Sequence, residues 1–145
     1  MNHYQKILLA LELNPESDDL LLKKAQEFSE AGHRQLYLIH AVEHLNNYGL
    51  AYGISAGVDV EEMLMGQAKK SMTEIGARFN IPPTQQITKI GPAKFVILEE
   101  AKQLGVDLIV VGSHGRHGVR LLLGSTANAI LHGAMCDVLA VRVKE

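Results

Sequence analysis

The stretch VVGSHGRHGVRLLLGSTA, residues 110–127, decides how this chain is interpreted. It begins as an apolar strand, continues as a basic loop punctuated by glycines, and ends in Gly124, Ser125 and Thr126, which is typical of a helix start. The first turn of a helix has unpaired backbone N–H groups and partial positive charge, so it attracts anions such as phosphate. Glycine lets the backbone approach such an anion closely. The stretch therefore predicts a phosphate site, in particular that of a nucleotide.

The loop adds local positive charge and a defined glycine spacing. Two residues separate Gly112 from Gly115, and eight residues separate Gly115 from Gly124. The side chains that carry or accept positive charge are His114, Arg116, His117 and Arg120. The two histidines could also bind a metal, but no cysteine or third ligand is near in sequence, which favours a phosphate partner or a surface role. A second reading stays open, in which the glycines only make a tight turn and a close helix–strand contact. The pattern is neither a Walker A loop nor a dinucleotide fingerprint.

Composition bounds the class of protein. The chain has 145 residues, 47% of them hydrophobic and 21% charged, which fits one globular domain. A formal net charge of −2 argues against a general nucleic-acid binder. Cys136 is the only cysteine, so no internal disulfide can form, as suits a reducing compartment. No signal-peptide pattern and no apolar run of membrane-spanning length occurs. We therefore expect a cytoplasmic protein that binds neither nucleic acid nor membrane.

Apolar runs alternate with helical patterns along the whole chain. The runs predict strands over residues 7–13, 36–42, 85–90, 106–111 and 138–143, the third nearer a sheet edge. Apolar residues at helical spacing predict a helix ending near Gly32, one that includes Leu64 and Phe79, one that follows Pro92, and one over residues 125–135. Residues 43–57 show no period and predict a long loop, which is interpreted as a lid over the site.

This alternation predicts an α/β fold, a single-domain doubly wound parallel sheet of five strands with helices on both faces. Ligands in such sheets bind beyond the carboxyl ends of the strands, where the strand order reverses. Gly112, Glu12 and residues 40–42 are expected at those ends. The glycine loop thus falls where the fold binds ligands.

Other residues have weaker signals. Glu12 is interpreted either as facing the ligand or a bound Mg²⁺, or as a solvated carboxylate at a strand end. Cys136 is expected to be a small buried residue and not a nucleophile. Met63, Met65 and Met72 are expected to fill core or edge gaps on a helix face. No nucleophile elbow, acid–base pair or metal cluster emerges, so the chain is expected to hold a ligand and not to transform one rapidly.

The chain resembles the universal stress protein family over nearly its whole length. The opening strand and turn at residues 6–17 and the second strand at residues 38–42 are similar to those of the family. More specific are Gly91-Pro92-Ala93, the segment from Asp107 to Gly115, and Leu122 to Ala127. Residues 136–139 complete the resemblance.

The resemblance implies a sheet in the order 3-2-1-4-5, usually in a homodimer paired through the last strand, here Asp137 to Val143. In nucleotide-binding members the glycine motif holds the phosphates of ATP, with or without Mg²⁺. Carried over, Ala41 and Val42 would meet the adenine, and Glu12 would lie near the ribose or metal. The phosphate contacts would come from Gly112, Gly115, Gly124, Ser125 and Thr126. Leu11, His114 and Arg116 complete the expected site.

Two departures separate this chain from the family pattern. The last glycine spacing is eight residues and not nine, which shortens the loop by up to about 3.5 Å of chain. Glu12 also stands where the family usually has aspartate. One branch of the family binds no ATP, and it lacks these glycines.

Three functions follow as hypotheses. The first is an ATP-binding stress-response protein, a homodimeric nucleotide sensor with at most slow ATP hydrolysis. The alternative is a nucleotide-independent dimeric interaction module for stress survival. An enzyme related to adenylating α/β proteins is a third reading, disfavoured because their phosphate loop follows the first strand, where this chain has Asn14-Pro15-Glu16-Ser17.

Overall fold

The computed structural model describes residues 4–27, 35–43, 54–113 and 124–143, with side chains omitted for 54–59. Within these ranges, strands and helices alternate as the sequence predicts. The elements are β1 (Lys6–Ala10), α1 (Pro15–Glu27), β2 (Gln35–Val42), α2 (Ile54–Phe79), the short 3-10 helix η3 (Pro83–Gln85), β3 (Gln86–Ile90), α3 (Ala93–Leu104), β4 (Leu108–Gly112), α4 (Ser125–Gly133) and β5 (Asp137–Val141).

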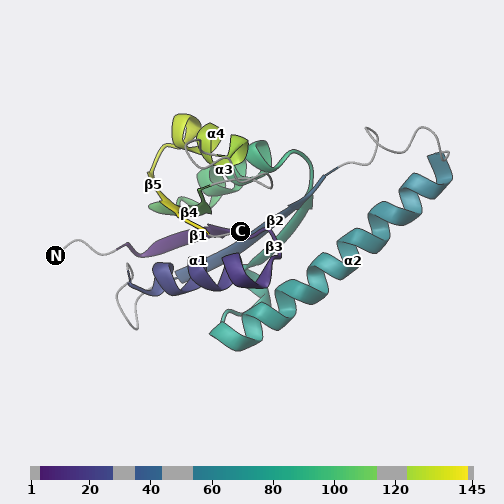
Figure 1. Ribbon diagram of the computed structural model, residues 1–145, viewed down its shortest axis with the longest axis horizontal. Helices are drawn as coiled ribbons and strands as arrows, with labels where there is room; N and C mark the ends of the chain where they lie inside the picture. The colour runs from purple at the N-terminus through teal and green to yellow at the C-terminus, as the bar shows by residue number, and fades with distance from the viewer. Residues whose placement is uncertain (1–3, 28–34, 44–53, 114–123, 144–145) are drawn as a thin grey trace.

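The five strands form one parallel sheet in the order β3-β2-β1-β4-β5, which confirms the predicted α/β fold and strand order (Figure 1). β1 lies at the centre and pairs with both β2 and β4; Leu8, for example, is opposite Tyr37 on one side and Ile109 on the other. Continuous apolar runs suit this position because both faces of a parallel sheet are covered. The order reverses between β1 and β4, so their carboxyl ends flank a natural crevice.

Helices cover both faces of the sheet, each over its own apolar core. On one face, α1 and α2 contribute residues such as Leu22 and Met72 to the core that also contains Leu9 (Figure 1). On the other, α3 and α4 contribute Ile97 and Ile130, which pack on the face that carries Leu8. Burial of these side chains provides the main stabilisation, at about 25 cal/mol per Å² of apolar surface removed from water.

Local signals explain where several elements begin and end. The side-chain Oδ1 of Asn14 accepts the N–H of Glu16 at 3.1 Å, which caps α1 ahead of Pro15. α3 follows Pro92 and ends at Gly105, whose φ of 67° is the left-handed conformation that glycine adopts without strain. These boundaries are encoded locally in the sequence.

Two predicted boundaries are wrong. The first strand was expected to continue to Leu13, but β1 ends at Ala10, and Leu13 has a φ of 64° that no strand accommodates. The turn forms because the carboxylate of Asp18 accepts the N–H of Glu12, so the chain bends into α1. The loop expected over residues 43–57 is also too long, since α2 already begins at Ile54. The helix runs through Gly57 despite the low helix propensity of glycine.

The predicted end of the first helix near Gly32 lies outside the described residues, which include α1 as far as Glu27. The other predicted elements lie within two or three residues of their observed positions. β3 is an edge strand, as expected, and most of its side chains are only partly buried. Of the methionines predicted to fill gaps, Met72 is buried, whereas Met63 is 58% exposed, so the prediction is wrong for Met63. None of the helices within the described ranges is long and apolar enough to cross a membrane.

Candidate functional site

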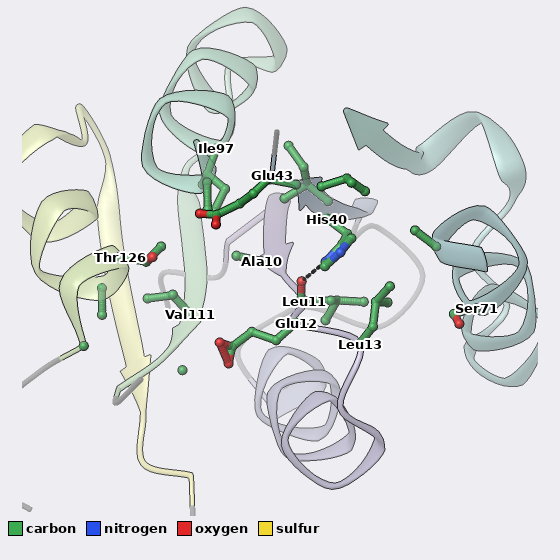
Figure 2. Close-up of a pocket in the computed structure, with 18 of the residues that line it drawn as sticks. Ala10, Leu11, Glu12, Leu13, His40, Glu43, Ser71, Ile97, Val111 and Thr126 are labelled. Carbon is green, nitrogen blue, oxygen red and sulfur yellow. Dashed lines mark hydrogen bonds between the residues drawn. The ribbon is translucent and has the colours of Figure 1, made fainter. Parts of the chain in front are cut away.

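A cleft of about 650 Å³ opens at the carboxyl ends of β1, β2 and β4, where the fold is expected to bind ligands (Figure 2). Its walls come from the ends of these strands, from the first turns of α3 and α4, and from the middle of α2. The lining residues are Ala10, Leu11, Glu12, Leu13, Ile39, His40, Ala41, Val42, Glu43, Leu64, Gln67, Ala68, Ser71, Ala93, Ile97, Val111, Gly112, Gly124, Ser125, Thr126 and Ala127.

One end of the cleft is formed by the start of α4. Its N-cap residue is Gly124, and no side chain in the described structure caps it by a hydrogen bond. α1 differs, because Asn14 caps its first turn. The amides of Ser125 and Thr126 belong to the first turn of α4, where helix geometry supplies no acceptor within the helix. This end of the cleft therefore offers N–H donors and the positive end of a helix dipole.

The start of α4 is fixed to the sheet by two backbone hydrogen bonds. The N–H of Gly124 donates to the carbonyl of Ser113 at 2.9 Å, and the N–H of Ser113 donates to the carbonyl of Val141 at 2.8 Å. Gly124 thus lies directly beside the end of β4. Figure 2 places Thr126 at this end of the cleft, close to Val111.

The end of β1 places one carboxylate at the cleft and another beneath it. Glu12 is exposed, and Figure 2 shows its carboxylate directed toward Val111 and away from His40. Its backbone N–H donates to Oδ1 of Asp18 at 3.2 Å, whereas Oδ2 of Asp18 has no partner within the described structure. Asp18 is only 1% exposed, and burial raises the pKa of its carboxyl to about 7. Asp18 thus supports the turn that carries Glu12.

The opposite end of the cleft lies between β2 and α2. Nδ1 of His40 is 2.8 Å from the carbonyl oxygen of Leu11, which accepts only, so Nδ1 donates (Figure 2). This bond ties the end of β2 to the end of β1. Ala41 and Val42 follow on β2 and line the cleft, as does Ser71 on α2.

The charge of the described lining is acidic. Glu12 and Glu43 line the cleft, and none of its lining residues within the described ranges is a lysine or arginine. Among the described residues there is also no group of three His, Cys, Asp or Glu side chains placed to hold a metal ion. Backbone amides, and not cationic side chains, are thus the anion-binding groups that this part of the chain offers.

The structure brings together eight of the eleven residues expected at the site: Leu11, Glu12, Ala41, Val42, Gly112, Gly124, Ser125 and Thr126 all line the cleft. The other three, His114, Gly115 and Arg116, lie outside the described residues, as do His117, Arg120 and most of the proposed lid. Whether these residues hold a ligand stays a prediction.

Sequence reasoning missed the contribution of α2 to the cleft. Leu64 belongs to the helix that apolar spacing predicted, and it also lines the cleft together with Gln67, Ala68 and Ser71. Their spacing of three and four residues was a usable signal for a shared helix face. Nothing in the sequence indicated that this face extends past the sheet.

Cys136 lies away from the cleft and differs from its expected environment. It was predicted to be buried but is only partly buried. Burial and the neighbouring Asp137 raise the pKa of its thiol, which keeps it protonated near neutral pH. The expectation that it is no activated nucleophile fits this environment.

Comparison with known proteins assigns the chain to a family. The sequence profile described as the universal stress protein family matches residues 3–142, so the chain belongs to this family. It is 65% identical over 144 residues to universal stress protein A homolog 2 of Coxiella burnetii, with 99% of both chains covered. The structure of the hypothetical protein MJ0577 superposes with a TM-score of 0.82 at 23% identity, covering 99% of each chain. A universal stress protein solved in complex with cAMP has a TM-score of 0.57 at 16% identity and covers 99% of this chain and 100% of its own.

Proposed function

We propose that this protein is a stress-response protein that binds ATP, or a related adenine nucleotide, in the cleft at the carboxyl ends of β1, β2 and β4. The observation that carries the proposal is the start of α4, where Gly124 provides no side-chain cap and the first-turn residues Ser125 and Thr126 line the cleft. A helix start left open in this way suits the phosphates of the ligand. A relative of the same fold, solved in complex with cAMP, supports an adenine nucleotide as the ligand.

The nucleotide would bind together with Mg²⁺. Because Glu12 and Glu43 repel a polyanion, a phosphate-bound Mg²⁺ would offset their charge. Arg116 and Arg120 of the glycine loop are the cationic side chains that would approach the phosphates. The chain's own contribution is to bind and orient the nucleotide, with at most slow hydrolysis, because no acid–base pair is assembled in the described lining.

The proposal also includes a homodimer that forms through β5 in the cytoplasm. β5 is an edge strand whose outer side has no neighbour in the sheet, and such edges pair readily with another strand. Val141, the last residue of β5, accepts the N–H of Ser113, whose own carbonyl holds Gly124 at the start of α4. Nucleotide binding in the cleft would therefore affect the dimer interface at β5. A dimer that works without nucleotide is the alternative.

The Gly124→Asp variant tests the site. Aspartate adds a side chain and a negative charge where the phosphates would lie, so we expect it to abolish the binding of Mg-ATP measured by isothermal titration calorimetry. Gln103→Glu is the matched control, because it adds one negative charge on α3 at a residue outside the cleft. Retained affinity in Gly124→Asp would contradict the site, as would equal losses in both variants.

A further inference from the structure

Three polar side chains at the α2 end of the cleft have no role in the phosphate site: His40, Gln67 and Ser71. Since Nδ1 of His40 donates to the Leu11 carbonyl, Nε2 of the neutral ring remains an acceptor. In residues 4–27, 35–43, 54–113 and 124–143, neither Gln67 nor Ser71 has a hydrogen-bond partner. Gln67 is exposed and Ser71 is partly buried, and the one buried unpartnered side-chain oxygen or nitrogen found in these ranges belongs to Asp18.

The surroundings of these groups suit a flat heteroaromatic ring. Leu11, Leu64 and Ala68 supply apolar walls, and Gln67 is itself exposed. Figure 2 shows Ser71 and His40 at the end of the cleft opposite Thr126 and Val111. Neighbouring strands lie about 4.8 Å apart, so the ends of β4 and β2 are about 10 Å apart across β1. A nucleotide with its phosphates at α4 would therefore place its base beside α2.

We propose that Gln67 on α2 selects adenine over guanine at this end of the cleft, an inference that rests on the proposed nucleotide site. A glutamine amide offers one donor and one acceptor side by side. That pair matches adenine, which presents the N6 amino group next to the N7 acceptor. Guanine presents two acceptors, O6 and N7, at the same edge, so the amide oxygen of Gln67 would be left without a donor. Ser71 and Nε2 of His40 flank this contact.

The test compares three ligands on the full chain by calorimetry: Mg-ATP, Mg-GTP and inorganic tripolyphosphate, which probes the phosphate end alone. We expect the wild type to bind ATP more tightly than GTP by roughly 5- to 150-fold, as one bidentate contact provides. Gln67→Ala should bring the ATP to GTP ratio close to one and leave tripolyphosphate binding unchanged. Gln103→Ala on α3 makes the same change outside the cleft and should keep the wild-type ratio.

Gln67→Glu separates recognition from a folding defect. A carboxylate accepts only, so it should reject the N7 edge of adenine and accept hydrogen bonds from N1–H and the N2 amino group of guanine, which moves the preference toward GTP. An unchanged ratio in Gln67→Ala, or equal binding of ATP and GTP by the wild type, would overturn the inference while the nucleotide site stands. Failure of the wild type to bind any of the three ligands would overturn both.

Discussion

Asp18 shows how a single residue can shape the site from outside it. Its carboxyl is enclosed between α1 and the sheet, one oxygen holds the N–H of Glu12, and the other has no partner in the described structure. Desolvation disfavours the charged form and raises its pKa to about 7, and the charge of Glu12 acts in the same direction. The sequence showed only an aspartate in the first turn of a helix, where exposure is the usual outcome.

The buried carboxyl predicts an unusual pH dependence of folding. Because the pKa of Asp18 in the folded state lies above its ordinary value near 3.8, the folded protein holds this proton more tightly than the unfolded chain does. The contribution of Asp18 to stability is therefore complete below about pH 4 and declines as the pH rises to about 7. The loss is on the order of a few kcal/mol.

Denaturant unfolding of wild type and Asp18→Asn between pH 4 and pH 8 measures this effect. We expect the wild type to lose stability relative to the variant as the pH rises, since asparagine does not ionise and its side-chain oxygen still accepts the Glu12 N–H. Parallel stability curves for the two proteins would show that Asp18 is ionised in the fold at all these pH values.

At the scale of elements, α2 departs furthest from its predicted form. Its buried face followed from apolar residues at helical spacing, and the helix ends just before Asn80, which has a φ of 60°. The first residue of α2 could not be predicted from the sequence, because Gly53 and Gly57 favour a loop locally. Its part in the cleft could not be predicted either, since the overhang depends on how the helix lies on the sheet.

Two glycines of α2 provide a matched test of this packing. A Cβ on Gly76 would lie 2.6 Å from the carbonyl oxygen of Ile81, whereas one on Gly66 would meet nothing within 4 Å. We expect Gly76→Ala to destabilise the protein by about 1–3 kcal/mol, because backbone must move. Gly66→Ala should stabilise it by about 0.5–1 kcal/mol through helix propensity. Thermal unfolding measures both, and equal shifts would contradict the described packing of α2 on the loop before β3.

At the scale of the whole molecule, the parallel sheet and its strand order followed well from the sequence. Buried apolar runs, glycine and proline boundaries and right-handed crossovers restrict an alternating chain to few arrangements. The position of the cleft could also be predicted, because ligands bind to such sheets at the carboxyl ends of the strands. What sequence could not provide is the neighbourhood of each site residue, such as the bond from His40 to Leu11, which joins residues 29 positions apart.

The dimer edge can be tested without disturbing the sheet. The carbonyl of Val141 accepts from Ser113 beside β4, so the backbone groups of Ala140 point to the open edge. Ala140→Pro removes an outward N–H, a change that edge strands tolerate. Sedimentation velocity should show a wild-type dimer, a dimer for Ala140→Ser, and a folded monomer for Ala140→Pro. A dimeric proline variant, or a monomeric wild type, would contradict pairing through β5.

The central claim is that the amides at the start of α4 bind the phosphates of a nucleotide, and calorimetric titration of the nucleotide-free wild-type protein with Mg-ATP tests it most directly. We expect a saturable heat with one nucleotide bound per chain and an affinity in the micromolar range or tighter. No measurable heat at millimolar Mg-ATP would contradict the account.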